Sequence, residues 1–303
     1  MKKLAAFIMA GRLQAVTAAV GFLALALVLP PFAVLSGAAI ALVTLRLGAK
    51  QGLTILGLAC LVLALMWWPL TGQPMSGLVV GLSLWLPSTV IAIVLWRTVS
   101  WTRALQAAIG FGAGLIVAVH VWVAEPERAW QRILELGVAP ALEQSGMSPG
   151  EIETTIAQFA GVMTSLVAMS IVLSMIGSLL IARYWQAALY NPGGFREEFH
   201  ELRFGLWPSL VVAAALLIGA SGVQIAIELA VVILIGYFLH GLAVVHALAR
   251  ILGWHVGWLI GLYLLMIPLS VQIMALLAAI GAIDAFADLR TRVAASRKGG
   301  DAD

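Results

Sequence analysis

The sequence predicts an all-α fold: a polytopic membrane helical bundle with 8–9 transmembrane helices, a short amphipathic outer cap and a cytoplasmic interfacial helix. Hydrophobic residues make up 62% of the 303 residues, whereas soluble domains have roughly 45–50% apolar residues. Charged residues make up only 10%, and uncharged runs long enough to cross a bilayer recur along the chain. A soluble fold cannot bury this much apolar surface. The composition therefore excludes a soluble enzyme, a nucleic-acid-binding module and a disordered chain.

Proline divides the first apolar region. Residues 13–45 carry no charge, and as one helix they would be on the order of 50 Å long, against a hydrocarbon core of about 30 Å. Pro30 and Pro31 interrupt helical hydrogen bonding, so we expect a tight hairpin of two helices. Residues 4–12 are interpreted as a retained interfacial helix, because Arg12 interrupts a possible signal peptide. Nine apolar runs are predicted: 13–29, 32–45, 53–68, 77–95, 104–123, 158–182, 206–220, 223–249 and 256–282.

Basic residues indicate the orientation. If the first six runs cross alternately, all but two of the Lys and Arg residues up to Arg203 fall on one side. The positive-inside rule assigns that side, and with it the N-terminus, to the cytoplasm. The opposite side receives Arg128 and Arg132, in a loop rich in Glu. The net charge of +3 is therefore a signal of topology and does not indicate a nucleic-acid partner.

The last third of the chain leaves two numbers of membrane crossings open, eight and nine. Nine crossings would place the basic cluster of the polar C-terminal tail, residues 290–303, outside, against the positive-inside rule. Eight crossings require one late run not to span, and 206–220 is the weakest because it is short and has Pro208 near its start. The charges favour eight crossings and a cytoplasmic C-terminus, whereas the apolar pattern alone favours nine.

The outer amphipathic loop, residues 124–157, is too long for a simple connection. Pro126 is suited to the first turn of a helix, and Ser148 and Glu151 form a capping box that opens another. We expect two short amphipathic helices on the outer surface, and we expect the helix opened at Ser148 to run into the membrane. The acidic residues of this loop mark either a solvated face or a docking face.

The cytoplasmic loop, residues 183–205, has a turn at Asn191-Pro192-Gly193-Gly194, followed by a short amphipathic segment. This segment either closes a loop at the membrane interface or contacts a protein partner. The candidate partner-interface residues are Arg183, Trp185, Gln186, Tyr190, Asn191, Pro192, Gly193, Gly194, Phe195, Phe199 and Arg203.

Four motifs resemble the YybS-like family of predicted bacterial inner-membrane proteins of unknown function. They are residues 11–15, Thr44-Leu45-Arg46 with Gly48 and Gly52, the stretch 183–203, and residues 284–290. The resemblance spans nearly the whole chain and implies a location in the bacterial inner (plasma) membrane. It also implies a remote similarity in fold to the substrate-binding components of energy-coupling-factor transporters, which present their substrate site from the outer side and depend on partner proteins. This last link is an analogy of fold.

Glu228 is the ionisable residue best placed inside an apolar run. Such residues are costly in hydrocarbon and are candidates for function, although a position near the end of the helix would let this carboxylate be solvated instead. Gln224 precedes it by one helical turn, and His240 follows on roughly the same face, about 18 Å along the helix. Glu228, Gln224 and His240 are the candidate ligand-binding residues.

Motifs for chemistry are absent from the sequence. The single Cys60, the His spacing and the lack of phosphate-binding and nucleophile motifs predict no catalytic site, no metal and no cofactor. His120 is interpreted as an interfacial histidine. Gly253, Gly257 and Gly261 predict a close helix contact. The acids and arginines from Asp284 to Arg292 are interpreted as the end of the last helix at the membrane surface.

We therefore expect a single integral membrane domain that is not an enzyme. The first hypothesis is a transporter-like component that binds a small molecule or lipid and acts with partners. The alternative is a structural or assembly protein that docks partners through residues 183–203. The expected partners are the lipid bilayer and a membrane or cytoplasmic protein, with no nucleic acid.

Overall fold

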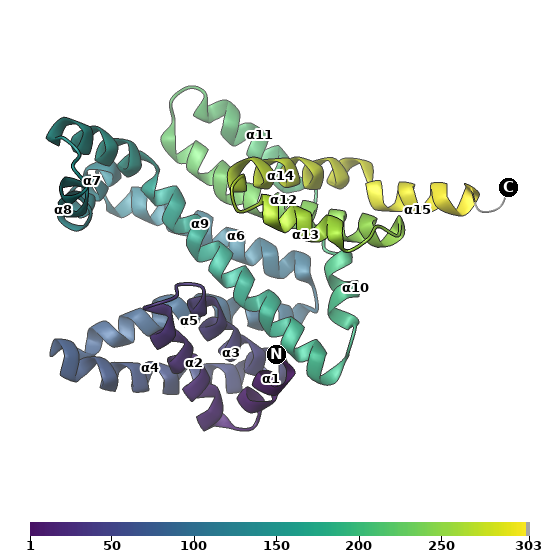
Figure 1. Ribbon diagram of the computed structural model, residues 1–303, viewed down its shortest axis with the longest axis horizontal. Helices are drawn as coiled ribbons and strands as arrows, with labels where there is room; N and C mark the ends of the chain where they lie inside the picture. Colours follow the sequence, from purple (N-terminus) through teal and green to yellow (C-terminus); the bar gives the residue numbers. More distant parts are fainter. Residues whose placement is uncertain (301–303) are drawn as a thin grey trace. The chain divides into compact units, whose positions relative to one another are not determined.

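The computed structural model describes residues 1–300, and all of their regular secondary structure is α-helical (Figure 1). The all-helical prediction is confirmed. Six described helices are long and apolar enough to cross a membrane, as expected of a multi-pass membrane protein: α4 (Ala49–Thr71), α5 (Pro74–Thr98), α6 (Trp101–Trp122), α9 (Pro149–Tyr190), α12 (Gln224–Ile251) and α14 (Ser270–Ala287).

Three apolar helices are shorter: α2 (Arg12–Ala26), α3 (Phe32–Leu47) and α11 (Trp207–Gly219). The other helices are α1 (Lys2–Met9), α7 (Pro126–Gly137), α8 (Ala139–Gln144), α10 (Gly194–His200), α13 (Gly257–Leu265) and α15 (Leu289–Gly300). Residues 301–303 of the predicted polar tail lie outside the described residues.

The described chain forms two compact units. The first comprises Met1–Ala108, Leu173–Leu206 and the chain from Gly236 onward; the second comprises Ile109–Val172 and Trp207–Ile235. The boundary between them falls within α6, α9 and α12. That the whole chain is a single membrane domain stays a prediction.

Helix α3 lies at the centre of the N-terminal part of the first unit. It packs against α2, α4 and α5, and its residues Ser36–Leu45 are all buried. The predicted hairpin at Pro30 and Pro31 is confirmed, since α2 ends at Ala26 and α3 begins at Phe32. The Ser36 hydroxyl donates to the carbonyl oxygen of Ala19 at 2.6 Å and accepts from the indole N–H of Trp85 at 2.8 Å. These bonds satisfy the polar groups of three adjoining helices.

Glycine allows the closest helix approach in the C-terminal part of the same unit. A Cβ atom on Gly281 of α14 would overlap the carbonyl oxygen of Tyr237 in α12, and one on Gly241 would overlap the carbonyl oxygen of Leu277. The predicted contact through Gly253, Gly257 and Gly261 is wrong. Gly253 lies in a turn with φ +69°, Gly257 begins α13, and a Cβ on Gly261 would meet nothing within 4 Å.

The run 256–282, predicted as one segment, is two helices. Helix α13 ends at Leu265 and α14 begins at Ser270, because Pro268 has no N–H with which to continue the helix. With nine residues, α13 is only about 13 Å long and cannot cross the hydrocarbon core.

The outer loop contains α7 and α8, and α9 begins at its end. The backbone N–H and the hydroxyl of Ser148 both donate to Oε2 of Glu151, at 2.8 and 2.7 Å. The Glu half of the predicted capping box is therefore present. The helix that it opens runs on into the apolar run 158–182, as the sequence indicates. It continues as the 42-residue α9, one unbroken helix in Figure 1.

Candidate functional site

The second unit contains a pocket of about 340 Å³ beside the end of α6, the start of α12 and the N-terminal half of α9. Helix α6 contributes His120 from its last turn, and α12 contributes Gln224 and Glu228 from its first two turns. Helix α9 and the start of α7 complete the wall with Ala160, Gly161, Thr164, Glu125, Pro126, Glu127 and Arg128. This volume is in the range of pockets that bind small organic molecules.

Helix periodicity and one side-chain hydrogen bond position these groups. Gln224 and Glu228 are four residues apart and therefore lie on one face of α12. The side-chain amide of Gln224 donates to the carbonyl oxygen of Gly161 at 2.8 Å, which links α12 to α9. The indole N–H of Trp130 donates to the Thr164 hydroxyl at 3.0 Å, which holds α7 beside the pocket.

The carboxylate of Glu228 is buried without a complete set of partners. Its side chain is 3% exposed, and Oε2 has no hydrogen-bond partner among the described residues. The nearest basic atom is Nδ1 of His120, at 3.7 Å. That nitrogen also lies 3.1 Å from the carbonyl oxygen of Ile116, within hydrogen-bond distance, whereas 3.7 Å to Oε2 is beyond it. His120 therefore does not satisfy Oε2 of Glu228.

The other charges of the pocket leave an excess of acid. Arg128 donates to both carboxylate oxygens of Glu125, at 2.8 and 2.6 Å, so these two charges offset each other at the rim. In the described part of the chain no ion pair neutralises the exposed Glu127. Among the residues lining the pocket, the negative charges of Glu228 and Glu127 are therefore opposed only by His120, which is positively charged only when it is protonated.

His240, the third predicted ligand-binding residue, belongs to the first unit and lies in a different cluster. Its Nε2 is 2.9 Å from Oδ2 of Asp284, and Arg290 donates to the same oxygen at 2.8 Å. All three side chains are buried. Arg290 also donates to the backbone carbonyl oxygens of His200 and Leu202. His240, Asp284 and Arg290 thus form a buried ion cluster. The sequence placed a helix end here, and α14 does end at Ala287; that this end lies at the membrane surface stays a prediction.

The residues predicted as a partner interface have many contacts within the first unit. Arg183 forms a two-pronged ion pair with Glu198, which also accepts from the indole N–H of Trp101 at 3.2 Å. Gln186 donates to the carbonyl oxygen of Leu45 at 3.1 Å. Trp185 is fully buried.

The aromatic residues of the same stretch pack against one another and against α12. Phe195 contacts Trp101, Tyr184 and Phe199, and Phe199 is buried beside His246. Among the predicted interface residues, the exposed side chains are those of Tyr190, Asn191 and Pro192, at the turn after α9, and that of Arg203. Arg203 pairs with Asp288 at 2.8 Å. The docking hypothesis stays a prediction.

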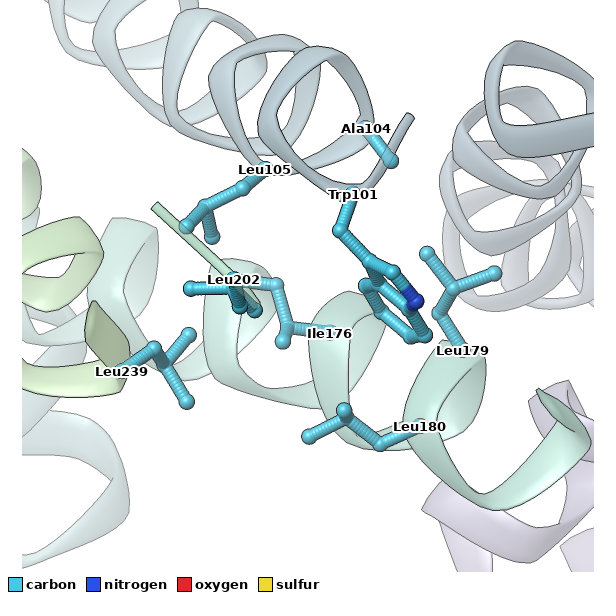
Figure 2. Close-up of a pocket in the computed structure, with 8 residues that line it drawn as sticks. All are labelled: Trp101, Ala104, Leu105, Ile176, Leu179, Leu180, Leu202 and Leu239. Carbon is cyan, nitrogen blue, oxygen red and sulfur yellow. The ribbon is translucent and has the colours of Figure 1, made fainter. Parts of the chain in front are cut away.

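A second pocket, in the first unit, is apolar and very small. Figure 2 shows its lining, which comes from α6, α9, α12 and the segment after α10: Trp101, Ala104, Leu105, Ile176, Leu179, Leu180, Leu202 and Leu239. Its volume of about 10 Å³ is at most that of one water molecule. It is therefore a packing defect of the core and has no room for a solute.

Sequence reasoning found part of the polar pocket. Glu228 and Gln224 lie in it, whereas His120, Thr164 and Glu127 were not proposed as site residues. A signal for His120 was available only in the count of nine crossings, which ends 104–123 and begins 223–249 on the same side of the membrane. The count of eight crossings, in which 206–220 does not span, places these two ends on opposite sides. The sequence did not indicate that α6 and α12 are neighbours in the fold.

Comparison of the chain with known proteins finds no matching family model, no matching curated protein and no matching solved structure.

Proposed function

We propose that this protein is a transporter-like membrane component that binds a small solute in the Glu228 pocket and acts together with partner proteins. The supporting observation is the buried carboxylate of Glu228, which faces a cavity of about 340 Å³ with one oxygen unpartnered. Burying a carboxylate without a partner is costly, and a bound solute would compensate that cost. The proposed role is binding, not catalysis.

The proposed membrane topology places the pocket at the outer side. Because the pocket joins the end of α6 to the start of α12, both lie at the outer side, and the chain crosses from the cytoplasmic α10 to α12 through α11. The eight crossings are then α2, α3, α4, α5, α6, α9, α11 and α12, whereas α13 and α14 together enter and leave on the cytoplasmic side, where Arg203 pairs with Asp288. The N-terminus is then cytoplasmic, α7 and α8 form an outer cap, and α10 is the cytoplasmic interfacial helix. Location in the bacterial inner membrane and membership of the YybS-like family are part of the proposal and rest on the sequence resemblance.

The proposal is tested by thermal unfolding of the purified chain in lipid nanodiscs against a library of small solutes. A solute present at 100 times its Kd stabilises the folded state by about 2.7 kcal/mol. We expect at least one solute to raise the Tm of the wild type and of Glu143→Gln, a matched control in α8 outside the pocket. Glu228→Gln should lose this response.

A second pair of variants tests the cavity without changing its charge. A Cβ on Gly161 would meet only Glu127, at 3.9 Å, so Gly161→Leu should extend into the pocket and block it. Gly150 also lies in α9 and has open space around it, so Gly150→Leu is the control. If every stabilising solute acts equally on Gly161→Leu and Gly150→Leu, the proposed site is wrong.

A further inference from the structure

We infer, on the basis of the proposed function, that the solute bound at Glu228 is a small organic cation whose charged group carries N–H donors: an ammonium or guanidinium ion. The pocket offers more negative than positive charge, since Arg128 is already paired with Glu125 while Glu228 and Glu127 lack a basic side chain of permanent charge. A cation entering this pocket removes an unfavourable excess of acid, whereas an anion increases it.

Hydrogen bonding narrows the kind of cation. Oε2 of Glu228 is buried and unpartnered, so the group that approaches it must donate a hydrogen bond as well as carry positive charge. An ammonium or guanidinium group does both. A quaternary ammonium ion has no N–H, and proteins usually bind it through aromatic rings. The only aromatic ring among the residues lining this pocket is the imidazole of His120.

The composition and size of the pocket disfavour a bare metal ion. The described residues contain no group of three or more His, Cys, Asp and Glu side chains able to hold a metal. The pocket, at about 340 Å³, is also on the order of ten times the roughly 30 Å³ share of one water molecule in the liquid. A ligand that fills it has a carbon skeleton beyond its charged group, and the apolar part of the wall, such as Ala160, suits such a skeleton.

The experiment compares probes of equal length and different charge on the full chain in zwitterionic nanodiscs by calorimetric titration. The probes are 4-aminobutan-1-ol, butane-1,4-diol and 4-hydroxybutanoate, with tetramethylammonium and Ca²⁺ as cations that lack N–H. We expect only the ammonium compound to bind. Glu228→Gln should weaken its binding about tenfold or more, Glu127→Gln should weaken it less because Glu127 is exposed, and Glu143→Gln should leave it unchanged.

Three results would overturn the inference: equal binding of the diol or the carboxylate, equal binding of tetramethylammonium or Ca²⁺, or ammonium binding that Glu228→Gln does not alter. Absence of ammonium binding to the wild type overturns it as well. Failure of this inference is separable from failure of the proposed function. If a neutral or anionic solute from the library binds, and its binding is lost in Gly161→Leu but not in Gly150→Leu, the solute site stands and only the inference of a cationic solute is refuted. If no solute of any charge shows binding that depends on Gly161, both the inference and the proposed function are refuted.

Discussion

Buried ionisable residues in this protein are of two kinds. Asp284 is fully buried but accepts from His240 and Arg290, so its charge is compensated within the chain. Glu228 is nearly as buried, yet one of its oxygens has no partner in the described chain. The first arrangement holds the segment after α10 in place, because Arg290 also binds its backbone carbonyl groups. The second leaves an acceptor for a ligand.

His200, in α10, makes stability depend on pH. Burial, followed by the positive charges of His246, Arg250, Arg196 and Arg290, lowers the pKa of His200 from 6.5 to about 4. The unfolded chain therefore binds more protons between these values, and the free energy of unfolding falls as the pH decreases from 6.5 to about 4. Above pH 6.5 His200 is neutral in the folded and the unfolded chain, and the free energy of unfolding is not reduced by this residue.

We expect His200→Gln to show a smaller loss of Tm than the wild type between pH 7.5 and 5. The measurement is thermal unfolding in detergent at both pH values. His255→Gln, at an exposed histidine, is the control and should keep the pH dependence of the wild type. Equal slopes for His200→Gln and the wild type would contradict the assigned role of His200.

At the scale of elements, the crossing of α12 and α14 depends on two glycines. Gly281→Ala places a methyl group against the Tyr237 carbonyl, and overpacking of this kind costs typically about 1–3 kcal/mol. Gly261→Ala, in α13, has open space and should be near neutral. Unfolding of both variants by heat or denaturant checks the difference, and a Gly281→Ala variant as stable as Gly261→Ala would disprove the tight crossing.

The helices also show which parts of the fold could be predicted from the sequence. The apolar runs gave the approximate limits of α2 to α6, because burial in lipid and the breaks at proline and glycine are local properties. The split between α13 and α14 was missed although Pro268 was visible in the sequence. The choice of Gly241 and Gly281 over Gly253, Gly257 and Gly261 as the contact depends on which helices are neighbours, and neighbouring helices are distant in sequence.

At the scale of the whole molecule, the proposed eight crossings place the two ends of the chain on the same side. In a Cys60→Ser background, Ser145→Cys should react with a membrane-impermeant maleimide from outside intact cells, because it lies between α8 and α9. Ser296→Cys, in α15, should react only after permeabilisation. Labelling of both from outside would contradict eight crossings, and protection of both would contradict the outer position of the loop.

The sequence by itself predicted that the surroundings of this protein are a lipid bilayer, that its fold is helical, and that Glu228 is an acid within an apolar run. These follow from composition and from periodicity along a single segment, which local physics decides. Only the tertiary structure decided that Glu228 shares a pocket with His120 and Thr164, while His240 instead meets Asp284 and Arg290. Such groupings arise from side-chain packing between helices far apart in the chain, and no local pattern encodes them.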